Sequence, residues 1–251
     1  MIHFVGAGSG AVDLITVRGQ KYLNEADVII YAGSLVNPEL LNYAKADCKI
    51  YDSASMTLED VISVMKQTES EGKMTVRLHT GDPSIYGAIR EQMDLLDESG
   101  IAYDVVPGVS SFCGAAAAMH AEYTLPEVSQ TVIITRMAGR TPVPEKEEIS
   151  LLASHGASMV IFLSTGMLEE LTERLIAGGY TKDTPAAIVY KASWPDEKKF
   201  LGTLGTLPQI ARKKNITKTA LIMVGNFLGN EYERSKLYDP TFTHEFRTAS
   251  K

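Results

Sequence analysis

The sequence predicts an α/β protein of two α/β/α domains, with a mostly parallel sheet in the N-terminal domain and a mixed sheet in the C-terminal one. Short apolar runs alternate with segments of helical period, and the alternation pauses at a proline-bearing stretch, residues 122–128, before it resumes. Such alternation is typical of sheets covered by helices on both faces. We expect domains over 1–118 and 119–230, followed by a polar tail over 231–251.

The first domain contains four apolar runs of strand length, each ending near glycine, proline or a polar residue. The predicted strands are Ile2–Val5, Val28–Tyr31, Met74–Leu78 and Tyr103–Val106. The segments between them predict the helices Thr16–Ala26, Thr57–Ser70 and Ser84–Asp97. In the last of these helices one apolar stripe is formed by Ile85, Ile89, Met93 and Leu96.

The second domain follows an alanine-rich helix, Cys113–Ala121, and begins a new series of strands. The predicted strands are Val132–Thr135, Met159–Leu163, Ala186–Tyr190 and Ala220–Val224. Met167–Ala177 has the spacing of an amphipathic helix. The polar tail has no such pattern, so we expect a mobile extension or an arm that lies on a partner subunit.

The charge and the cysteines exclude several classes of protein. The chain has 251 residues and a net charge of −7, which argues against nonspecific binding to nucleic acid. Cys48 and Cys113 lie far apart with no metal-ligand spacing around them, so we expect reduced thiols and no metal site. The start of the chain has the pattern of a strand rather than a signal peptide, and no apolar run is long enough to span a membrane. We therefore expect a cytoplasmic protein.

The glycine-rich segment Gly6–Ala11, "GAGSGA", formally matches the fingerprint of dinucleotide-binding domains. That fingerprint also requires an acid at the end of the second strand, where it binds the ribose. Here the second strand ends Tyr31-Ala32-Gly33, and the nearest acid, Asp27, precedes the strand. An NAD-dependent oxidoreductase is therefore disfavoured, and the glycines are better explained by a sharp turn and close packing.

Two strand-to-helix turns predict a ligand site at the carboxyl ends of the parallel strands, where open α/β sheets bind ligands. In the first turn, "TGDP", we expect Asp82 to cap a helix that begins at Pro83, while Gly81 permits a close backbone approach. The second turn, "VVPGVSSFCGAAAA", places Ser110 and Ser111 at the start of a helix of small residues.

Four segments resemble the ordered motifs of the tetrapyrrole (class III) methyltransferase family over residues 2–228. They are "GAGSGAVDLIT", "GDPSIYG", "VPGVSSFCGAAA" and "TPAAIVYKASWP". The segments "RLHTGDPSIYGAIREQM", "TRMAGRTPVPE" and "IVYKASWPDE" are most similar to the subfamily that methylates C11 of (cobalt-)precorrin-4 in cobalamin synthesis. The resemblance implies S-adenosyl-L-methionine as methyl donor, bound in the cleft between the two domains.

The resemblance also implies a set of cofactor-binding residues. The backbone around Thr80, Gly81 and Asp82 should hold the methionine portion, with Ile85, Ser110 and Ser111 nearby. Leu163 should pack on the adenosine, while Ala192 and Ala220 should contact the adenine end.

The implied substrate is an anionic tetrapyrrole, whose carboxylates require cationic partners in an otherwise acidic chain. Arg136 and Arg140 are the first candidates, through bidentate contacts, and Lys191 and Arg90 come next. The implied reaction transfers a methyl group to an electron-rich ring carbon, so alignment and exclusion of water are the main tasks. No catalytic residue can be named, and His79 is better explained as a structural histidine at a strand end. Relatives in the family imply a homodimer.

Two departures from the family pattern affect the choice of substrate. At the first turn Ser9, Ala11 and Val12 replace the proline, acid and proline that relatives usually carry. Uroporphyrinogen-type enzymes have an aspartate after the second strand, where this chain has Ala32-Gly33. Uroporphyrinogen methylation is therefore disfavoured. The alternatives within the fold are the C20 and C17 precorrin methyltransferases, diphthine synthase and a ribosomal RNA ribose methyltransferase; from another class, the alternative is a noncatalytic tetrapyrrole carrier.

Overall fold

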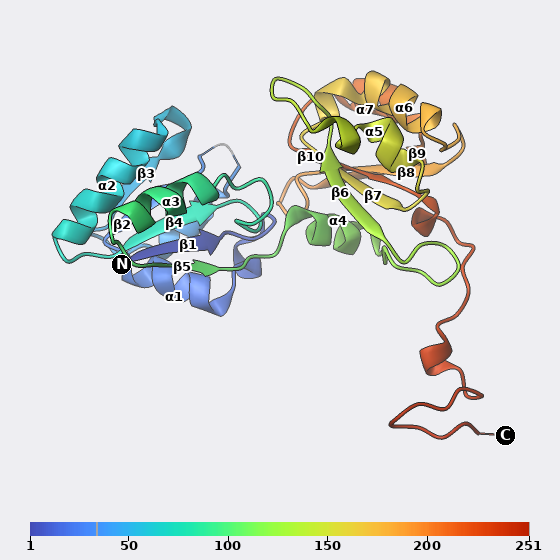
Figure 1. Cartoon of the computed structure of the whole chain (residues 1–251), viewed down its shortest axis with the longest axis horizontal. Coiled ribbons are helices and arrows are strands. Elements are labelled where there is room, and N and C mark those ends of the chain that lie inside the picture. Colours follow the sequence, from blue (N-terminus) through green and yellow to red (C-terminus); the bar gives the residue numbers. More distant parts are fainter. Residues whose placement is uncertain (34, 251) are drawn as a thin grey trace. The chain divides into compact units, whose positions relative to one another are not determined.

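The computed structural model describes residues 1–33 and 35–250 and divides into two compact units (Figure 1). Unit 1 comprises Met1–Ala115 together with the segment Lys191–Glu197. Unit 2 comprises Ala116–Tyr190 and the chain from Lys198 onward. The chain therefore passes from one unit to the other three times, because residues 191–197 return to unit 1.

Unit 1 is built on a five-stranded sheet of order β3-β2-β4-β1-β5, in which every neighbouring pair is parallel. Its strands are β1 (Ile2–Gly6), β2 (Val28–Tyr31), β3 (Lys49–Asp52), β4 (Thr75–His79) and β5 (Tyr103–Val106). The sequence prediction of a parallel first sheet is confirmed. It missed β3, an edge strand whose residues are mostly exposed.

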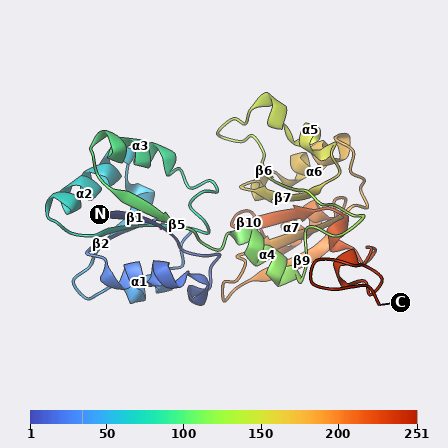
Figure 2. The same ribbon diagram turned by 60° about the horizontal axis from the view of Figure 1, so that its bottom comes forward.

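Helices cover both faces of this sheet, as Figure 2 shows, and each face has its own apolar core. On one face Leu23 of α1 (Val17–Glu25) packs against Ile29 and Leu78. On the other face α2 (Leu58–Ser70) and α3 (Arg90–Glu98) cover the side chains of Phe4 and Ile30. Burial of each such large apolar side chain contributes about 1.5–3 kcal/mol, so the sheet is fixed on both sides.

Unit 2 contains a mixed sheet of order β6-β7-β10-β8-β9, as the sequence predicts. Only β6 and β7 run parallel; β10 is antiparallel to β7 and β8, and β8 is antiparallel to β9. The strands are β6 (Val132–Arg136), β7 (Ser158–Phe162), β8 (Pro185–Tyr190), β9 (Lys198–Thr203) and β10 (Ala220–Val224).

The largest core of unit 2 lies between this sheet and α5 (Ile149–Ala153), α6 (Leu168–Ala177) and α7 (Leu207–Lys214). Leu171 and Leu175 of α6 are fully buried there, as the predicted helical stripe requires. On the opposite face of the sheet the hydroxyl of Ser158 donates to the Tyr123 carbonyl, and the Tyr123 ring lies 5.0 Å from the ring of Phe227.

Short 3₁₀ helices complete the described structure. They are Val12–Leu14, Pro38–Tyr43, Ser53–Ser55, Glu145–Glu147, Thr165–Met167, Asn226–Leu228 and Lys236–Tyr238. α4 (Ser111–Met119) contains the boundary between the units. In the tail a guanidinium nitrogen of Arg247 donates to the carbonyls of Leu237 and Asp239. None of the helices described spans enough apolar length to cross a bilayer.

One helix prediction was wrong at its start. The sequence places a helix over Ser84–Asp97 with Asp82 as its cap, but α3 begins only at Arg90. Residues 83–86 form a turn instead, and Tyr86 in this turn and Ala88 after it adopt left-handed backbone conformations with φ of 55° and 49°. Such conformations cannot continue a right-handed helix.

Candidate functional site

Three turns meet at the carboxyl edge of the unit 1 sheet, and we call them together the unit 1 edge: residues 6–11 after β1, 80–84 after β4 and 107–111 after β5. They meet because β1 lies between β4 and β5 in the sheet. A Cβ atom on Gly6 would lie 2.5 Å from Gly108 Cα and 2.7 Å from the Gly81 carbonyl oxygen. A Cβ on Gly108 would lie 2.1 Å from the same oxygen. Only glycine fits at these positions, so the turns touch backbone to backbone.

A short bridge joins the first two turns of the unit 1 edge. The Gly81 N–H donates to the Gly8 carbonyl at 2.9 Å, and the Gly8 N–H donates to the Gly81 carbonyl at 3.3 Å. Gly81 has φ of +60° and Gly8 has φ of +80°, values that side-chain-bearing residues rarely adopt. Backbone geometry therefore favours glycine at both positions, and at Gly8 a Cβ would also lie 2.7 Å from the Leu14 carbonyl oxygen.

The carboxylate of Asp82 joins the second turn to the third. Oδ1 accepts hydrogen bonds from the N–H and the hydroxyl of Ser84, at 2.8 and 2.5 Å, while Oδ2 accepts the Gly108 N–H at 2.8 Å. Burial by itself would raise the pKa of Asp82, but these hydrogen bonds outweigh it and lower the pKa below its usual value. Asp82 is therefore a charged clamp between two turns, and not the cap of α3.

The other predicted cofactor residues of unit 1 surround these turns. A Cβ on Gly81 would stand 3.4 Å from Ser110 Cα and 3.5 Å from the Ser111 nitrogen, so Gly81 lies directly beside the start of α4. The Thr80 hydroxyl donates to the Leu35 carbonyl at 3.0 Å, and Ile85 is half-buried within the turn. α4 begins at Ser111, and the N–H groups of Cys113 and Gly114 donate to the Ser110 carbonyl at 3.0 and 3.2 Å. The positive end of a helix suits an anionic or carbonyl group of a ligand.

The first glycine turn is covered by segment 191–197 of the same unit, which we call the strap. The hydroxyls of Ser9 and Ser193 lie 2.8 Å apart, and the Ala11 N–H donates to Ser193 Oγ at 3.0 Å. A Cβ on Gly10 would lie 2.0 Å from Cδ1 of Trp194, so the indole packs on bare backbone. From the other side the buried Asn37 amide donates to the Gly10 carbonyl at 2.9 Å. The first glycine turn is therefore held from two sides, by the strap and by Asn37.

The strap also holds two of the sequence-predicted residues. Ala192 is buried, and a Cβ on Gly114 of α4 would stand 3.4 Å from Ala192 Cβ. Lys191 is ion-paired with Asp196 at 2.7 Å and its Nζ lies 5.1 Å from the Trp194 ring centroid. Lys191 and Ser193 both have left-handed backbone, with φ of 47° and 65°. Strained backbone of this kind clusters at binding sites, which makes the strap a candidate wall of the site.

Beneath the unit 1 edge, β4 buries Arg77 and His79 on one face. The Arg77 guanidinium donates to Gln92 Oε1 at 3.2 Å and to the Ile30 carbonyl at 3.1 Å. Burial lowers the pKa of Arg77 to about 10, and burial together with the charge of Arg77 lowers the pKa of His79 to about 3. His79 is therefore a neutral, buried imidazole at neutral pH, which fits the structural role expected from the sequence.

The carboxyl end of β2 is occupied by an acid from the neighbouring strand. The Gly33 N–H donates to Asp52 Oδ1 at 3.1 Å, and a Cβ on Gly33 would lie 2.1 Å from that oxygen. A side chain at position 33 would therefore require the exposed Asp52 carboxylate to move.

In unit 2 the strand register brings three predicted residues to one edge of the mixed sheet, which we call the unit 2 edge. Arg136 ends β6, where it pairs with Phe162, and Leu163 follows β7 directly. β10 runs in the opposite direction and begins at this edge with Ala220. Leu163 is 65% exposed and has φ of +54°, an unusual state for an apolar residue that suits contact with a ligand.

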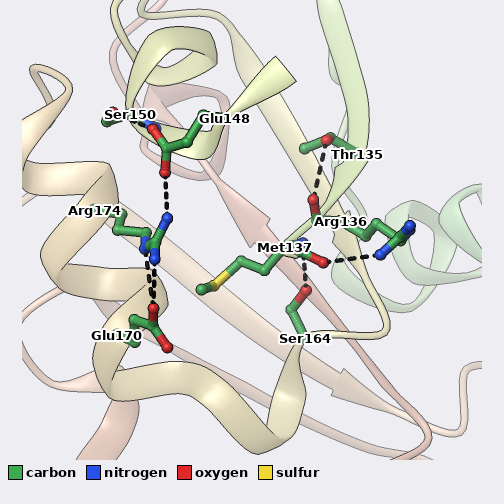
Figure 3. Close-up of polar contacts among 8 residues, drawn as sticks. All are labelled: Thr135, Arg136, Met137, Glu148, Ser150, Ser164, Glu170 and Arg174. Atoms are coloured by element: carbon green, nitrogen blue, oxygen red, sulfur yellow. Dashed lines mark hydrogen bonds and ion pairs between the residues drawn. The ribbon is translucent and has the colours of Figure 1, made fainter. Parts of the chain in front are cut away.

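The Arg136 guanidinium contacts the loop that follows β6, and Figure 3 shows its contact with the Met137 carbonyl. Its two terminal nitrogens donate to the carbonyls of Met137, Thr141 and Pro142, at 3.1, 3.1 and 2.6 Å. Arg140 lies exposed within the loop that these carbonyls shape. In unit 1 the fourth predicted cation, Arg90, begins α3; its side chain is 85% exposed and pairs with Asp94 at 2.7 Å.

Sequence reasoning missed three polar residues that hold these turns: Asn37, Ser164 and Ser193. Ser164 is fully buried and accepts the Met137 N–H at 2.9 Å. A serine directly after a strand was the available signal for Ser164. For Ser193 the signal was its place inside the motif "KASWP", and for Asn37 the only signal was the following proline.

Comparison with known proteins gives a consistent result. The sequence profile of the family described as tetrapyrrole (corrin/porphyrin) methylases matches residues 1–208. The chain is 55% identical over 251 residues to the cobalt-precorrin-4 C(11)-methyltransferase of Methanocaldococcus jannaschii, covering 100% of this chain and 97% of that protein. It is 46% identical to the enzyme of the same name from Priestia megaterium, covering 100% and 98%.

Solved structures agree with these relatives. The crystal structure of the cobalamin biosynthetic enzyme cobalt precorrin-4 methyltransferase, CbiF, superposes with a TM-score of 0.89 at 45% identity, covering 91% of this chain and 96% of that one. A uroporphyrin-III C-methyltransferase from Thermus thermophilus, in complex with S-adenosylhomocysteine, has a TM-score of 0.75 at 22% identity and covers 90% and 92%. At that identity the likeness concerns the fold alone.

Proposed function

The chain belongs to the tetrapyrrole (corrin/porphyrin) methylase family, and we propose that it transfers a methyl group from S-adenosyl-L-methionine to C11 of cobalt-precorrin-4 or precorrin-4 in cobalamin biosynthesis. The observation that carries the proposal is the similarity over the whole chain to relatives of this activity. The unit 1 edge supports it, because three turns without side chains at Gly6, Gly81 and Gly108 offer backbone groups to a donor with amino and carboxylate groups.

Each part of the described site has a task in this reaction. When bound, S-adenosylmethionine supplies a methyl group on a positively charged sulfur, which becomes a neutral thioether after transfer. The glycine turns and the positive end of α4 bind the amino-acid portion of the donor, and Asp82 holds these turns in register. The apolar side chain of Leu163 and the buried Ala192 contact its adenosine. We expect the backbone of Thr80 together with Ile85, Ser110, Ser111 and Ala220 to complete the donor contacts.

Methyl transfer to an electron-rich ring carbon needs an aligned donor and acceptor and a dry site, and no side chain has to act as nucleophile. His79 is buried and neutral, so we do not assign it as a base. The cationic residues of the substrate site are proposed to be Arg140, Lys191 and Arg90. The expected position of the donor between the two domains stays a prediction, as do the homodimer and the cytoplasmic location.

The proposal is tested by incubating the purified protein with S-adenosylmethionine and either cobalt-precorrin-4 or precorrin-4. We expect the tetrapyrrole to gain one methyl group at C11 and an equal amount of S-adenosylhomocysteine to form. Comparison of the two substrates shows whether cobalt is required. Methylation at C20 or C17 would assign the chain to another position of the ring. Binding of the tetrapyrrole without turnover would indicate a carrier.

A further inference from the structure

The loop between β6 and α5, residues 137–148, is fixed at its beginning by two independent anchors (Figure 3). The first anchor is Arg136, whose guanidinium donates to three carbonyls of the loop, those of Met137, Thr141 and Pro142. The second anchor is Ser164, which accepts the Met137 N–H at 2.9 Å and donates to the Phe162 carbonyl at 2.7 Å.

The end of the loop is fixed as firmly as its beginning. Glu148 accepts the Ser150 N–H at 2.7 Å and so caps α5, and it pairs with Arg174 of α6 at 2.7 Å. Arg174 is itself held by Glu170 at 2.6 Å. A loop anchored at both ends loses little conformational entropy when a ligand binds it, which favours affinity.

Between its anchors the loop is exposed and already shaped. The Gly139 N–H donates to the Thr141 carbonyl at 3.1 Å, and Pro142 and Pro144 restrict the following backbone. Arg140 lies in this turn, between the residues that Arg136 holds, and is exposed. The acceptors described for the Arg136 guanidinium are main-chain carbonyls.

We propose that Arg136 is a positioning residue that holds loop 137–148 in shape, and that Arg140 is the residue of this loop that binds a carboxylate of the substrate. This inference rests on the proposed function, since it is the tetrapyrrole that brings the carboxylates. Three of the five N–H groups of the Arg136 guanidinium already donate to carbonyls of the loop, so the position of this side chain is tied to the shape of the loop. Affinity for the substrate then depends on the conformation of the loop as well as on its charge.

The decisive comparison uses lysine variants at the two positions, with KM for the tetrapyrrole, kcat and the affinity for S-adenosylmethionine as readouts. Arg140→Ala should raise KM about tenfold or more, the scale of a charged hydrogen bond, and Arg140→Lys should recover part of that loss. Arg136→Lys should behave like Arg136→Ala, because one ammonium cannot reach three carbonyls in the same geometry. In all four variants kcat and the affinity for the donor should stay close to the parent values.

A second arm separates positioning from direct binding. Hydrogen exchange of residues 137–147 should become about tenfold faster or more in Arg136→Ala and in Ser164→Ala, which removes an anchor without changing charge. It should not change in Arg140→Ala. In the double variant Arg136→Ala/Arg140→Ala, KM should stay within about twofold of the worse single variant, because both substitutions remove the same contact between the loop and the substrate. Arg212→Ala, an exposed arginine of α7 paired with Glu169, is the control.

The outcomes are distinct. If Arg136→Lys restores KM while Arg136→Ala does not, or if the two single effects multiply in the double variant, Arg136 binds substrate directly and the inference is wrong. Unchanged exchange in Ser164→Ala and Arg136→Ala would show that the loop needs neither anchor. If the parent protein methylates no tetrapyrrole, the proposed function fails, and the exchange measurements still decide whether the loop is clamped.

Discussion

At the scale of single residues, the unit 1 edge depends on glycines whose hydrogen atoms face the backbone of a neighbouring turn. Gly6 and Gly108 have no space for a methyl group, because the nearest atoms belong to main chain that cannot rotate away. The site is thus defined by the absence of side chains at these positions. This explains why a search for catalytic side chains in the sequence finds none.

Gly108→Ala should therefore damage the edge and displace the backbone groups that are proposed to bind the donor. The added Cβ would lie 2.1 Å from the Gly81 oxygen, so the turns must separate, at a cost of about 1–3 kcal/mol or more. Calorimetry should show a large loss of affinity for S-adenosylmethionine, together with a lower Tm. Gly166→Ala is the control, because its Cβ would meet only one oxygen, at 3.5 Å. Equal effects of the two substitutions would contradict this account.

Asp82→Asn tests the carboxylate clamp. The amide that replaces the carboxylate presents one acceptor and one donor, so it can serve either Ser84 or the Gly108 N–H but cannot accept from both. We expect a loss of about 1–3 kcal/mol in unfolding free energy and weaker donor binding. Asp94→Asn, on the exposed surface of α3, should leave both quantities within error. A fully stable Asp82→Asn protein with parental affinity would mean that the clamp is unimportant.

At the scale of elements, the sequence predicted strands best where an apolar run lies between turn residues, even at the sheet edge that β5 forms. The residue ranges of β2, β5 and β10 were predicted as they are observed, because apolar runs between turn residues leave little ambiguity. β3 and β9 were missed, since both are edge strands with exposed polar residues such as Lys49 and Lys198. Their pairing partners are decided by tertiary contacts that a local pattern does not contain.

The start of α3 shows a second limit of prediction from the sequence. Asp82 followed by Pro83 has the chemistry of a helix start, but the same chemistry serves a turn whose aspartate is bonded elsewhere. Here the second carboxylate oxygen is taken by Gly108, which lies 26 residues away in sequence. Asp82, Gly81 and Ser110 were therefore correctly chosen as neighbours at one edge, while the reason given for Asp82 was wrong.

The strap offers an element-scale test with a built-in reporter, because Trp194 is the only tryptophan of the chain. In Gly10→Ala the new methyl group would overlap the indole and displace it. We expect the emission maximum to move to longer wavelength as the half-buried ring gains contact with water, and donor affinity to fall. Gly166→Ala should leave the emission unchanged. An unshifted spectrum in Gly10→Ala would show that Trp194 does not pack on this turn in solution.

At the scale of the whole molecule, stability should depend on pH through His79. Its pKa in the folded state is about 3, against about 6.5 when unfolded, so only the unfolded chain takes up a proton in this interval. The resulting loss of unfolding free energy is absent above pH 6.5 and grows as the pH falls toward 3. Glu148 acts in the same direction at lower pH, because its folded pKa is about 2.

Urea unfolding of the parent and of His79→Gln between pH 7.5 and 4.5 checks this expectation. The parent should lose unfolding free energy as the pH falls, and the variant should lose less, whatever its stability at pH 7.5. His155→Gln, in which an exposed histidine is replaced, should follow the parent curve. Parallel curves for the parent and His79→Gln would assign the acid sensitivity to other groups.

The strap belongs to unit 1 but lies within the second half of the polypeptide. A single crossover between two related genes therefore cannot exchange one complete unit for another. A gene chimaera joined near residue 115 would place a foreign strap on a native glycine turn, so that Ser193 and Trp194 from one parent would meet Ser9 and Gly10 from the other. Exchanges between relatives should therefore succeed most often when codons 6–11 and 191–197 come from the same ancestor.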